Sequence, residues 1–267
     1  MNLTEKQIER YSRQIILPEI GGIGQKKLLN AKVLVIGCGG LGSPCVYYLA
    51  AAGIGEIGLV DSDKVELNNL QRQVVHFTQN VGQAKVDSAK EKLLALNPEI
   101  QITTYKLRVT SENIMDLIKE YDIIVDGSDN FPTRYLVNDA CVISKKPLSH
   151  AGILRFDGQA MTIVSGKGPC YRCVFPEPPP PGTVPSCQEA GILGVVAGIL
   201  GIIQATEVLK YILGKGELLI GKLIVFNALE MSFRKLNILR DENCPVCGNK
   251  PTITKLIDYE QFCQINR

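Results

Sequence analysis

Short apolar runs rich in β-branched residues alternate along this chain with longer segments of helical spacing. The first run, Lys32–Ile36, leads through a glycine-rich turn into a predicted helix over 43–52 and a second strand over 56–60. Strand, helix and strand within roughly 30 residues are typical of a βαβ unit, whose two strands are parallel. Further helices are predicted over 81–96, 111–119 and 132–144, and further strands over 100–105, 122–126, 147–152 and 158–164. The pattern predicts an α/β fold: a Rossmann-like, doubly wound, mainly parallel sheet with helices on both faces.

After residue 165 the regular alternation of predicted strands and helices ends. Four consecutive prolines lie in the segment 176–185, which cannot join a helix or a sheet interior and is expected to cross the surface in extended form. A helix over 191–213 and a late strand over 222–227 follow. The uncharged stretch of 190–203 is shorter than the ~20 residues that span a bilayer, which favours a buried helix.

We predict one domain over 1–267. Its parts are an N-terminal helical arm (1–30), a nucleotide-binding α/β core (31–165), a segment with cysteine knuckles, crossover loop, buried helix and late strand (166–250), and a C-terminal antiparallel extension (251–267).

Charge is balanced along the sequence, with 29 basic and 27 acidic residues and a net charge of +2. No run of one sign provides a footprint for nucleic acid or a membrane surface, so we expect neither as a partner. The first residues lack the features of a signal peptide, and Thr4 to Gln7 has the pattern of a helix capping box. We therefore expect a cytoplasmic protein.

A glycine motif follows the first strand, with Gly37, Gly39 and Gly42 in G-x-G-x-x-G spacing. Such a turn at a helix N-terminus directs backbone N–H groups toward phosphate. Asp61 ends the second strand, where a carboxylate can accept ribose hydroxyls. The two features together predict a nucleotide site, although the motif alone also fits tight packing of strand and helix or an NAD-dependent oxidoreductase.

Residues nearby favour chemistry at phosphorus. Arg72 and Lys85 can neutralise charge that moves during transfer, and Asp129, after a predicted strand, can hold Mg²⁺ through oxygen. Plainer alternatives remain for these side chains: Lys85 as a solvated helix charge, and Asp129 as a helix cap.

Nine cysteines include two C-x-x-C pairs, Cys170 with Cys173 and Cys244 with Cys247. Four thiolates can surround one tetrahedral Zn²⁺ and leave no open position, which predicts a structural site. Two separate redox pairs or free thiols are the alternative. Cys187 follows the proline-rich segment just before a predicted helix start, where a thiol can be accessible and acidic; it is either a nucleophile or passive.

In order and spacing, these motifs resemble the HesA/MoeB/ThiF family, which is related to ubiquitin-activating enzymes. The resemblance covers almost the whole chain and is carried by the following residues: Arg10-Tyr-Ser-Arg13-Gln-Ile, the Gly37–Gly42 loop, Asp61-Ser-Asp63, Asn68-Asn69-Leu-Gln71-Arg72-Gln, Lys85, Asp129-Asn130 and the two cysteine pairs.

The family implies roles for individual residues. Gly39 and Gly40 would lie against the phosphates of ATP, Asp61 would bind ribose, and Asn69 and Arg72 would hold the triphosphate. Lys85 would lie near the α-phosphate and Asp129 would position Mg²⁺, with Asp63, Asn68, Gln71 and Asn130 completing the nucleotide site. Arg13 would reach the nucleotide of a partner subunit, which implies a homodimer; an ordinary surface salt bridge is the alternative for this residue. Cys187 occupies the position of a cysteine that links covalently to the carrier protein in some members.

The resulting hypothesis is an adenylyltransferase that activates the C-terminal glycine carboxylate of a small ubiquitin-like sulfur carrier of molybdopterin or thiamine type. The tail would end in Gly-Gly, because a narrow channel admits residues without side chains. A separate sulfur donor would then complete a thiocarboxylate. The rivals are an NAD-dependent oxidoreductase, a non-catalytic zinc-stabilised scaffold, and a tRNA-modifying ATPase of the same family.

Overall fold

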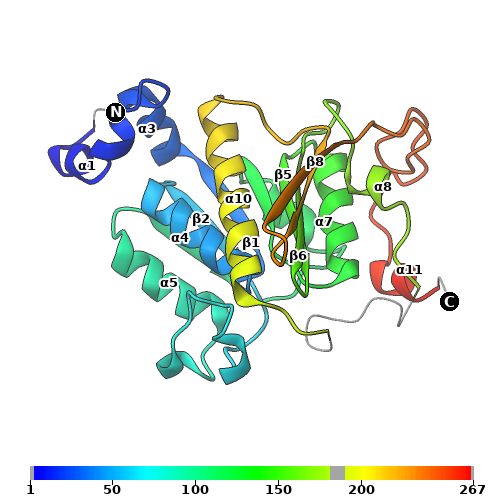
Figure 1. Ribbon diagram of the computed structural model, residues 1–267, viewed down its shortest axis with the longest axis horizontal. Coiled ribbons are helices and arrows are strands. Elements are labelled where there is room, and N and C mark those ends of the chain that lie inside the picture. The colour runs from blue at the N-terminus through cyan, green and yellow to red at the C-terminus, as the bar shows by residue number, and fades with distance from the viewer. Residues whose placement is uncertain (1–2, 181–189, 266–267) are drawn as a thin grey trace.

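An eight-stranded mixed sheet runs through the middle of the computed structural model, which describes residues 3–180 and 190–265 (Figure 1). The strands are β1 Lys32–Ile36, β2 Glu56–Val60, β3 Gln101–Tyr105, β4 Ile123–Asp126, β5 Leu148–Leu154, β6 Asp157–Ile163, β7 Lys222–Asn227 and β8 Ser232–Asn237. The α-helices are α1 Glu5–Arg10, α2 Ser12–Ile15, α3 Gly21–Asn30, α4 Gly42–Ala52, α5 Lys85–Leu96, α6 Ile114–Ile118, α7 Phe131–Ser144, α8 Tyr171–Val174, α10 Gly194–Leu213 and α11 Tyr259–Ile265. Two 3₁₀ turns, Leu67–Asn69 and Thr78–Asn80, lie between β2 and α5.

The strand order is β3-β2-β1-β4-β5-β6-β7-β8. Strands β3, β2, β1, β4 and β5 are mutually parallel, whereas β6, β7 and β8 are added antiparallel. The chain winds from β1 in one direction to β3 and then returns to place β4 on the other side of β1. The predicted doubly wound, mainly parallel α/β fold is therefore confirmed, and its switch point lies between β1 and β4, where such folds bind ligands. The antiparallel strands lie within 157–237, and not in the extension over 251–267 where they were expected.

Both faces of the parallel strands are buried, as their continuous apolar runs require. On β1, Val33 and Val35 pack into the cluster formed with α4, α5 and α10, while Leu34 and Ile36 pack into the cluster formed with α6 and α7. Successive residues of a strand point to opposite faces, so one five-residue strand contributes to two cores.

The long apolar helix α10 packs against α4, β5 and β6 (Figure 1). Among the described residues it is the helix long and apolar enough to cross a membrane by length and composition. Leu200 and Val208 are fully buried on one face, whereas Val195 and Ile202 are exposed on the other. A Cβ atom at Gly201 would clash with the carbonyl oxygen of Leu41, so glycine permits the close approach of α10 to the start of α4.

The N-terminal arm lies against the C-terminal end of α4. The predicted capping box is confirmed: the Thr4 hydroxyl accepts from the Gln7 backbone N–H, and the Gln7 side chain accepts from the Thr4 N–H. Gln14 and Gln25 both donate to the Ala52 carbonyl, the last residue of α4. The arm is therefore held at the end of α4 opposite to the glycine loop.

Four points of the sequence analysis need correction. The helix predicted from 81 begins only at Lys85, because Gly82 has a φ of +89° and turns the chain. The helix predicted from 191 begins at Gly194, because Gly191 has a φ of +74° and Ile192 bridges to Arg155. Strand β8 was not predicted, since nearly all of its residues are exposed and it shows no alternation. The C-terminal extension adds a helix, α11, and no strand within the described residues.

Candidate nucleotide site and metal knuckle

A cavity of about 370 Å³ opens at the carboxyl ends of β1, β2 and β4. Eight of the residues predicted to bind nucleotide line it: Gly39, Gly40, Asp61, Asp63, Arg72, Lys85, Asp129 and Asn130. They come from five separate stretches of sequence, which the doubly wound topology brings to one edge of the sheet. The structure thus gathers most of the predicted set around one opening.

The glycine loop forms the floor of this cavity between β1 and α4. Gly37 has a φ of +95°, and a Cβ atom there would lie 2.7 Å from the Gly127 carbonyl oxygen, so a side chain is excluded both by conformation and by space. Gly40 lies close to Arg72, whose Cγ would be 3.6 Å from an added Cβ. Because α4 begins at Gly42, its N-terminal dipole favours an anion at this position.

Asp61 is tied to the glycine loop. Its carboxylate accepts the backbone N–H of Cys38 at 2.8 Å and that of Asp63 at 2.8 Å. Burial raises the pKa of Asp61, and the positive charge of Lys85 together with these two N–H donors opposes that rise. The carboxylate is thereby fixed at the end of β2 with its oxygens at the cavity wall.

Lys85 is only 7% exposed, which is inconsistent with a solvated helix charge. Its Nζ lies 2.9 Å from Oδ2 of Asp63, whose side chain is mostly exposed. Arg72 donates from Nη1 to the Asn68 carbonyl at 3.0 Å. Two cations from different segments therefore line one cavity, and each carries more N–H donors than these bonds use, which suits an anionic ligand.

Three predicted nucleotide residues do not line the cavity. Asn69 is buried in the turn before Arg72, where its side-chain oxygen accepts the Glu66 N–H and its amide donates to Asn68. Gln71 packs against the start of α10 at Gly194. Asn68, Asn69 and Gln71 thus shape the loop that carries Arg72, and their contact with a nucleotide stays a prediction.

Asp129 and Asn130 divide two tasks that the sequence left open. The N-cap of α7 is Asn130, whose side chain accepts the Thr133 N–H at 2.9 Å. Asp129 precedes it and lines the cavity, so the hypothesis that Asp129 itself caps the helix is wrong. The Asp129 carboxylate is therefore not used as a helix cap, and its oxygens are the kind of ligand that Mg²⁺ prefers.

Two further predicted residues lie elsewhere. Arg13 is exposed on α2, in the arm that packs at the far end of α4 from the cavity. Cys187 falls in 181–189, outside the described residues.

Sequence reasoning overlooked several cavity residues. Leu107, Arg108 and Val109 follow β3, and Ile153 and Ile192 close another side. For Leu107, Arg108, Val109 and Ile153 the signal was their position after a predicted strand end, whereas Ile192 fell within a predicted helix. No residue type marked them, because their role depends on which loops meet in space.

The four cysteines of the two C-x-x-C pairs form a single cluster. All four Sγ atoms lie within 4.8 Å of one another, with Cys170 and Cys244 at 3.6 Å and Cys173 and Cys247 at 3.3 Å. Sulfurs of a tetrahedral site with metal–sulfur bonds of about 2.3 Å are separated by under 4 Å, so the set fits one four-coordinate metal. Separate redox pairs are disfavoured, because the close contacts run between the pairs.

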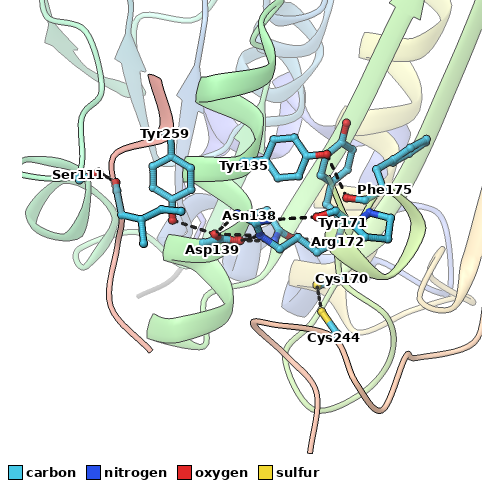
Figure 2. A network of polar contacts seen from close by, with 12 residues as sticks. Ser111, Tyr135, Asn138, Asp139, Cys170, Tyr171, Arg172, Phe175, Cys244 and Tyr259 are labelled. Carbon is cyan, nitrogen blue, oxygen red and sulfur yellow. Dashed lines mark hydrogen bonds and ion pairs between the residues drawn. The ribbon is translucent and has the colours of Figure 1, made fainter. Parts of the chain in front are cut away.

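The metal knuckle is anchored by a buried ion pair (Figure 2). Arg172, between the first two cysteines and 1% exposed, binds the carboxylate of Asp139 on α7 through Nε at 2.9 Å and Nη2 at 2.8 Å. Tyr259 of α11 donates its hydroxyl to the same carboxylate at 2.8 Å. The guanidinium also packs against the rings of Tyr135 and Phe262, with its carbon 4.7 and 4.6 Å from their centroids. One arginine thus joins the knuckle, α7 and the C-terminal helix.

Taken together, the switch-point cavity, the glycine loop and the paired cations define a Rossmann-type nucleotide-binding protein. Comparison with known proteins is consistent with this class. A model described as the ThiF family matches residues 11–246. A sulfur carrier protein adenylyltransferase of Thermus thermophilus is 51% identical and aligns over 98% of this chain and 99% of its own length. The chain belongs to the ThiF family and, like this relative, is an adenylyltransferase, so the resemblance drawn from the motifs is confirmed.

Other relatives are longer. The adenylyltransferase and sulfurtransferase MOCS3 of Sus scrofa is 52% identical, and the match covers 98% of this chain but 58% of that protein. The probable adenylyltransferase/sulfurtransferase MoeZ of Mycobacterium tuberculosis is 49% identical, with 67% of its length covered. Among solved structures, Escherichia coli MccB matches with a TM-score of 0.81 and 30% identity over 94% of this chain and 74% of that one.

Proposed function

We propose that this enzyme adenylates the C-terminal carboxylate of a small ubiquitin-like sulfur-carrier protein ending in Gly-Gly. The reaction is carrier-COO⁻ + MgATP → carrier-CO-AMP + pyrophosphate. The observation that supports it most strongly is the joint position of Lys85, Arg72 and Asp129 on one cavity above the glycine loop. The carrier is the substrate class in the name of the Thermus thermophilus relative.

Catalysis by this arrangement consists of placement and charge compensation. A carrier carboxylate is ionised at neutral pH and needs no general base. Lys85 and Arg72 would offset the charge that builds on the phosphates as the carboxylate oxygen bonds to the α-phosphorus and pyrophosphate leaves. Asp129 would hold Mg²⁺, which screens the same charge, and Asp61 would bind the ribose.

Lys85 is aimed by its neighbour. The ion pair with Asp63 holds the ammonium at the cavity wall, while the low exposure of Lys85 reduces competition from water. Because Asp63 is mostly exposed, the pair leaves the charge of Lys85 only partly compensated from inside the protein. A bound phosphate would complete the neutralisation.

The position of Arg13 supports a homodimeric enzyme. Its helix packs near Ala52, at the far end of the 11-residue helix α4 from the glycine loop, a separation of about 16 Å along the axis. Arg13 would therefore serve the nucleotide site of a second subunit rather than its own.

The four-cysteine cluster would hold Zn²⁺ in a closed, structural site, since all four ligands come from the protein. The sulfur would come from a separate donor, and Cys187 would act after adenylation. The carrier that the enzyme adenylates would show whether it serves molybdopterin or thiamine synthesis.

ATP–pyrophosphate exchange with a panel of purified Gly-Gly carriers tests the proposal. Wild type should exchange only with its own carrier, Arg72→Ala should lose exchange by about a hundredfold or more, and Cys187→Ala should retain it. Lys119→Ala is the matched control: it removes one positive charge from the end of α6, before β4 and hence at the opposite edge of the sheet. Exchange in Arg72→Ala at the rate of the control would refute the site assignment.

A further inference from the structure

His76 lies at the junction of the segments that carry the predicted phosphate-binding groups, although it does not line the cavity. The side chain is buried, at 3% exposure. Its Nε2 is 3.0 Å from the Cys38 carbonyl oxygen in the glycine loop, and its Nδ1 is 2.9 Å from Oγ of Ser88 on α5. Its own backbone N–H donates to Gln73, the residue after Arg72. This one residue therefore connects the glycine loop and the helix that begins with Lys85 through its imidazole, and the turn that carries Arg72 through its backbone.

The partners decide which ring nitrogen carries the proton. A carbonyl oxygen can only accept, so Nε2 donates to Cys38 and Nδ1 accepts from the Ser88 hydroxyl. Burial lowers the pKa of His76 to about 4; the nearby charges of Lys85 and Lys92 act in the same direction and the bond to Cys38 opposes them. The ring is neutral at physiological pH, with one fixed tautomer.

This bond sets the direction of one peptide group in the glycine loop. The peptide between Cys38 and Gly39 is planar and trans, so its C=O and N–H point in opposite directions. With the C=O directed at buried His76, the N–H of Gly39 points away from it, and Gly39 lines the cavity. The preceding peptide is held as well, because the Cys38 N–H donates to Asp61.

We propose that His76 is a positioning residue for the nucleotide: it fixes the Cys38–Gly39 peptide so that the Gly39 N–H faces an anionic phosphate group in the cavity. This inference rests on the proposed function, since it takes the cavity ligand to be a nucleotide. Without the Nε2 donor, the one donor left to the Cys38 carbonyl among the described residues is the Ser43 hydroxyl, at 3.4 Å. Rotation of the peptide would then present an oxygen, rather than an N–H, to the phosphate.

Through its bond to Ser88, His76 also helps to position the ammonium group of Lys85. Ser88 lies three residues after Lys85, on the buried side of α5. The imidazole therefore holds the glycine loop at a fixed distance from the helix turn that presents Lys85.

Two substitutions separate the bonds. The amide nitrogen of Gln reaches the position of Nε2, so His76→Gln keeps a donor for Cys38. The amide of Asn reaches only the position of Nδ1, so His76→Asn keeps a partner for Ser88 and loses Cys38. We expect His76→Asn to weaken ATP binding by about tenfold to a hundredfold, the usual effect of misplacing one donor to a charged ligand. His76→Gln should remain within about threefold of wild type.

Calorimetric titration of both variants with ATP and with adenosine tests this. Adenosine lacks phosphate, so its affinity should be unchanged in His76→Asn, with the loss confined to ATP. Equal loss of adenosine and ATP, or equal loss in the two variants, would show that His76 serves the fold alone and overturn the inference. Failure of wild type to bind ATP would instead refute the proposed function.

A measurement on wild type covers the case in which His76→Asn does not fold. In amide spectra of ¹⁵N-glycine-labelled protein, assigned with Gly39→Ala, the Gly39 N–H should move downfield with ATP and stay in place with adenosine. An unmoved resonance at saturating ATP would contradict the proposal.

Discussion

Two buried polar clusters hold this protein together in different ways: one at the nucleotide end, beside the glycine loop, and one at the metal end, around Asp139 of α7 and the four clustered cysteines. At the nucleotide end, the neutral imidazole of His76 donates a hydrogen bond to the Cys38 carbonyl of the glycine loop, while Lys85 forms an ion pair with the exposed carboxylate of Asp63. At the metal end, Arg172 and Asp139 neutralise each other in full burial, and Tyr259 completes the carboxylate's bonds. The first cluster leaves charge for a ligand; the second leaves none. Changes at the first should alter binding and catalysis, and changes at the second should alter stability.

Loss of a metal ligand should have the largest effect. Cys244→Ser removes one of four thiolates, and structural zinc sites contribute about 10 kcal/mol or more of apparent binding free energy to the folded form. We expect loss of bound zinc and a much lower midpoint of thermal unfolding, measured by elemental analysis and circular dichroism. Cys263→Ser, at a half-buried cysteine outside the cluster, is the control. Stoichiometric zinc in Cys244→Ser would contradict the four-thiolate assignment.

The buried ion pair should come next. Arg172→Ala leaves the Asp139 carboxylate buried without its partner, which costs about 3–5 kcal/mol in the free energy of unfolding. The double change Arg172→Met with Asp139→Leu should cost less than the single one, because no charge is left unpaired. Tyr259→Phe removes one hydrogen bond and should cost about 1 kcal/mol. Urea unfolding measures all three variants. If the double variant were less stable than Arg172→Ala, the loss in Arg172→Ala would not come from burying an unpaired carboxylate.

Lys85→Met should separate activity from stability. We expect pyrophosphate exchange to fall about 10²–10³-fold, since one cation facing the reacting phosphate is removed, with only a small change in thermal midpoint. The control is Lys119→Met, an exposed lysine at the other edge of the sheet. If Lys85→Met unfolded at a much lower temperature yet kept its exchange rate, Lys85 would serve stability rather than catalysis.

The last prediction concerns the pH dependence of stability. The pKa of His76 is lowered from 6.5 to about 4 by burial, so its folded-state contribution is complete above pH 6.5 and is lost as pH falls toward 4. That loss amounts to about 3 kcal/mol. Urea unfolding at pH 7 and pH 4.5 should show a smaller drop for His76→Gln than for wild type. Parallel drops would mean that the imidazole is not neutral in the fold.

The sequence predicted the fold well where local and global signals agree. The parallel strands are short apolar runs buried on both faces, and the capping box at Thr4 lies within one helical turn. Both features can be predicted because they depend on residues close together in the sequence. Strand β8 was missed because its stability comes from pairing with β7 rather than from its own pattern. The starts of α5 and α10 were misplaced because Gly82 and Gly191 adopt positive φ angles that composition alone does not show.

For the site, the sequence by itself determined the chemical inventory: a phosphate-binding glycine turn, a carboxylate after β2, two cations and four thiols in two pairs. Only the tertiary structure decided which of these meet. It joined the thiols across 74 residues, gave the cap of α7 to Asn130 rather than Asp129, buried Lys85 beside Asp63 and placed His76 under the glycine loop. The reason is physical: spacing along the chain encodes local geometry, whereas burial and hydrogen-bond partners depend on contacts that exist only after the sheet has formed.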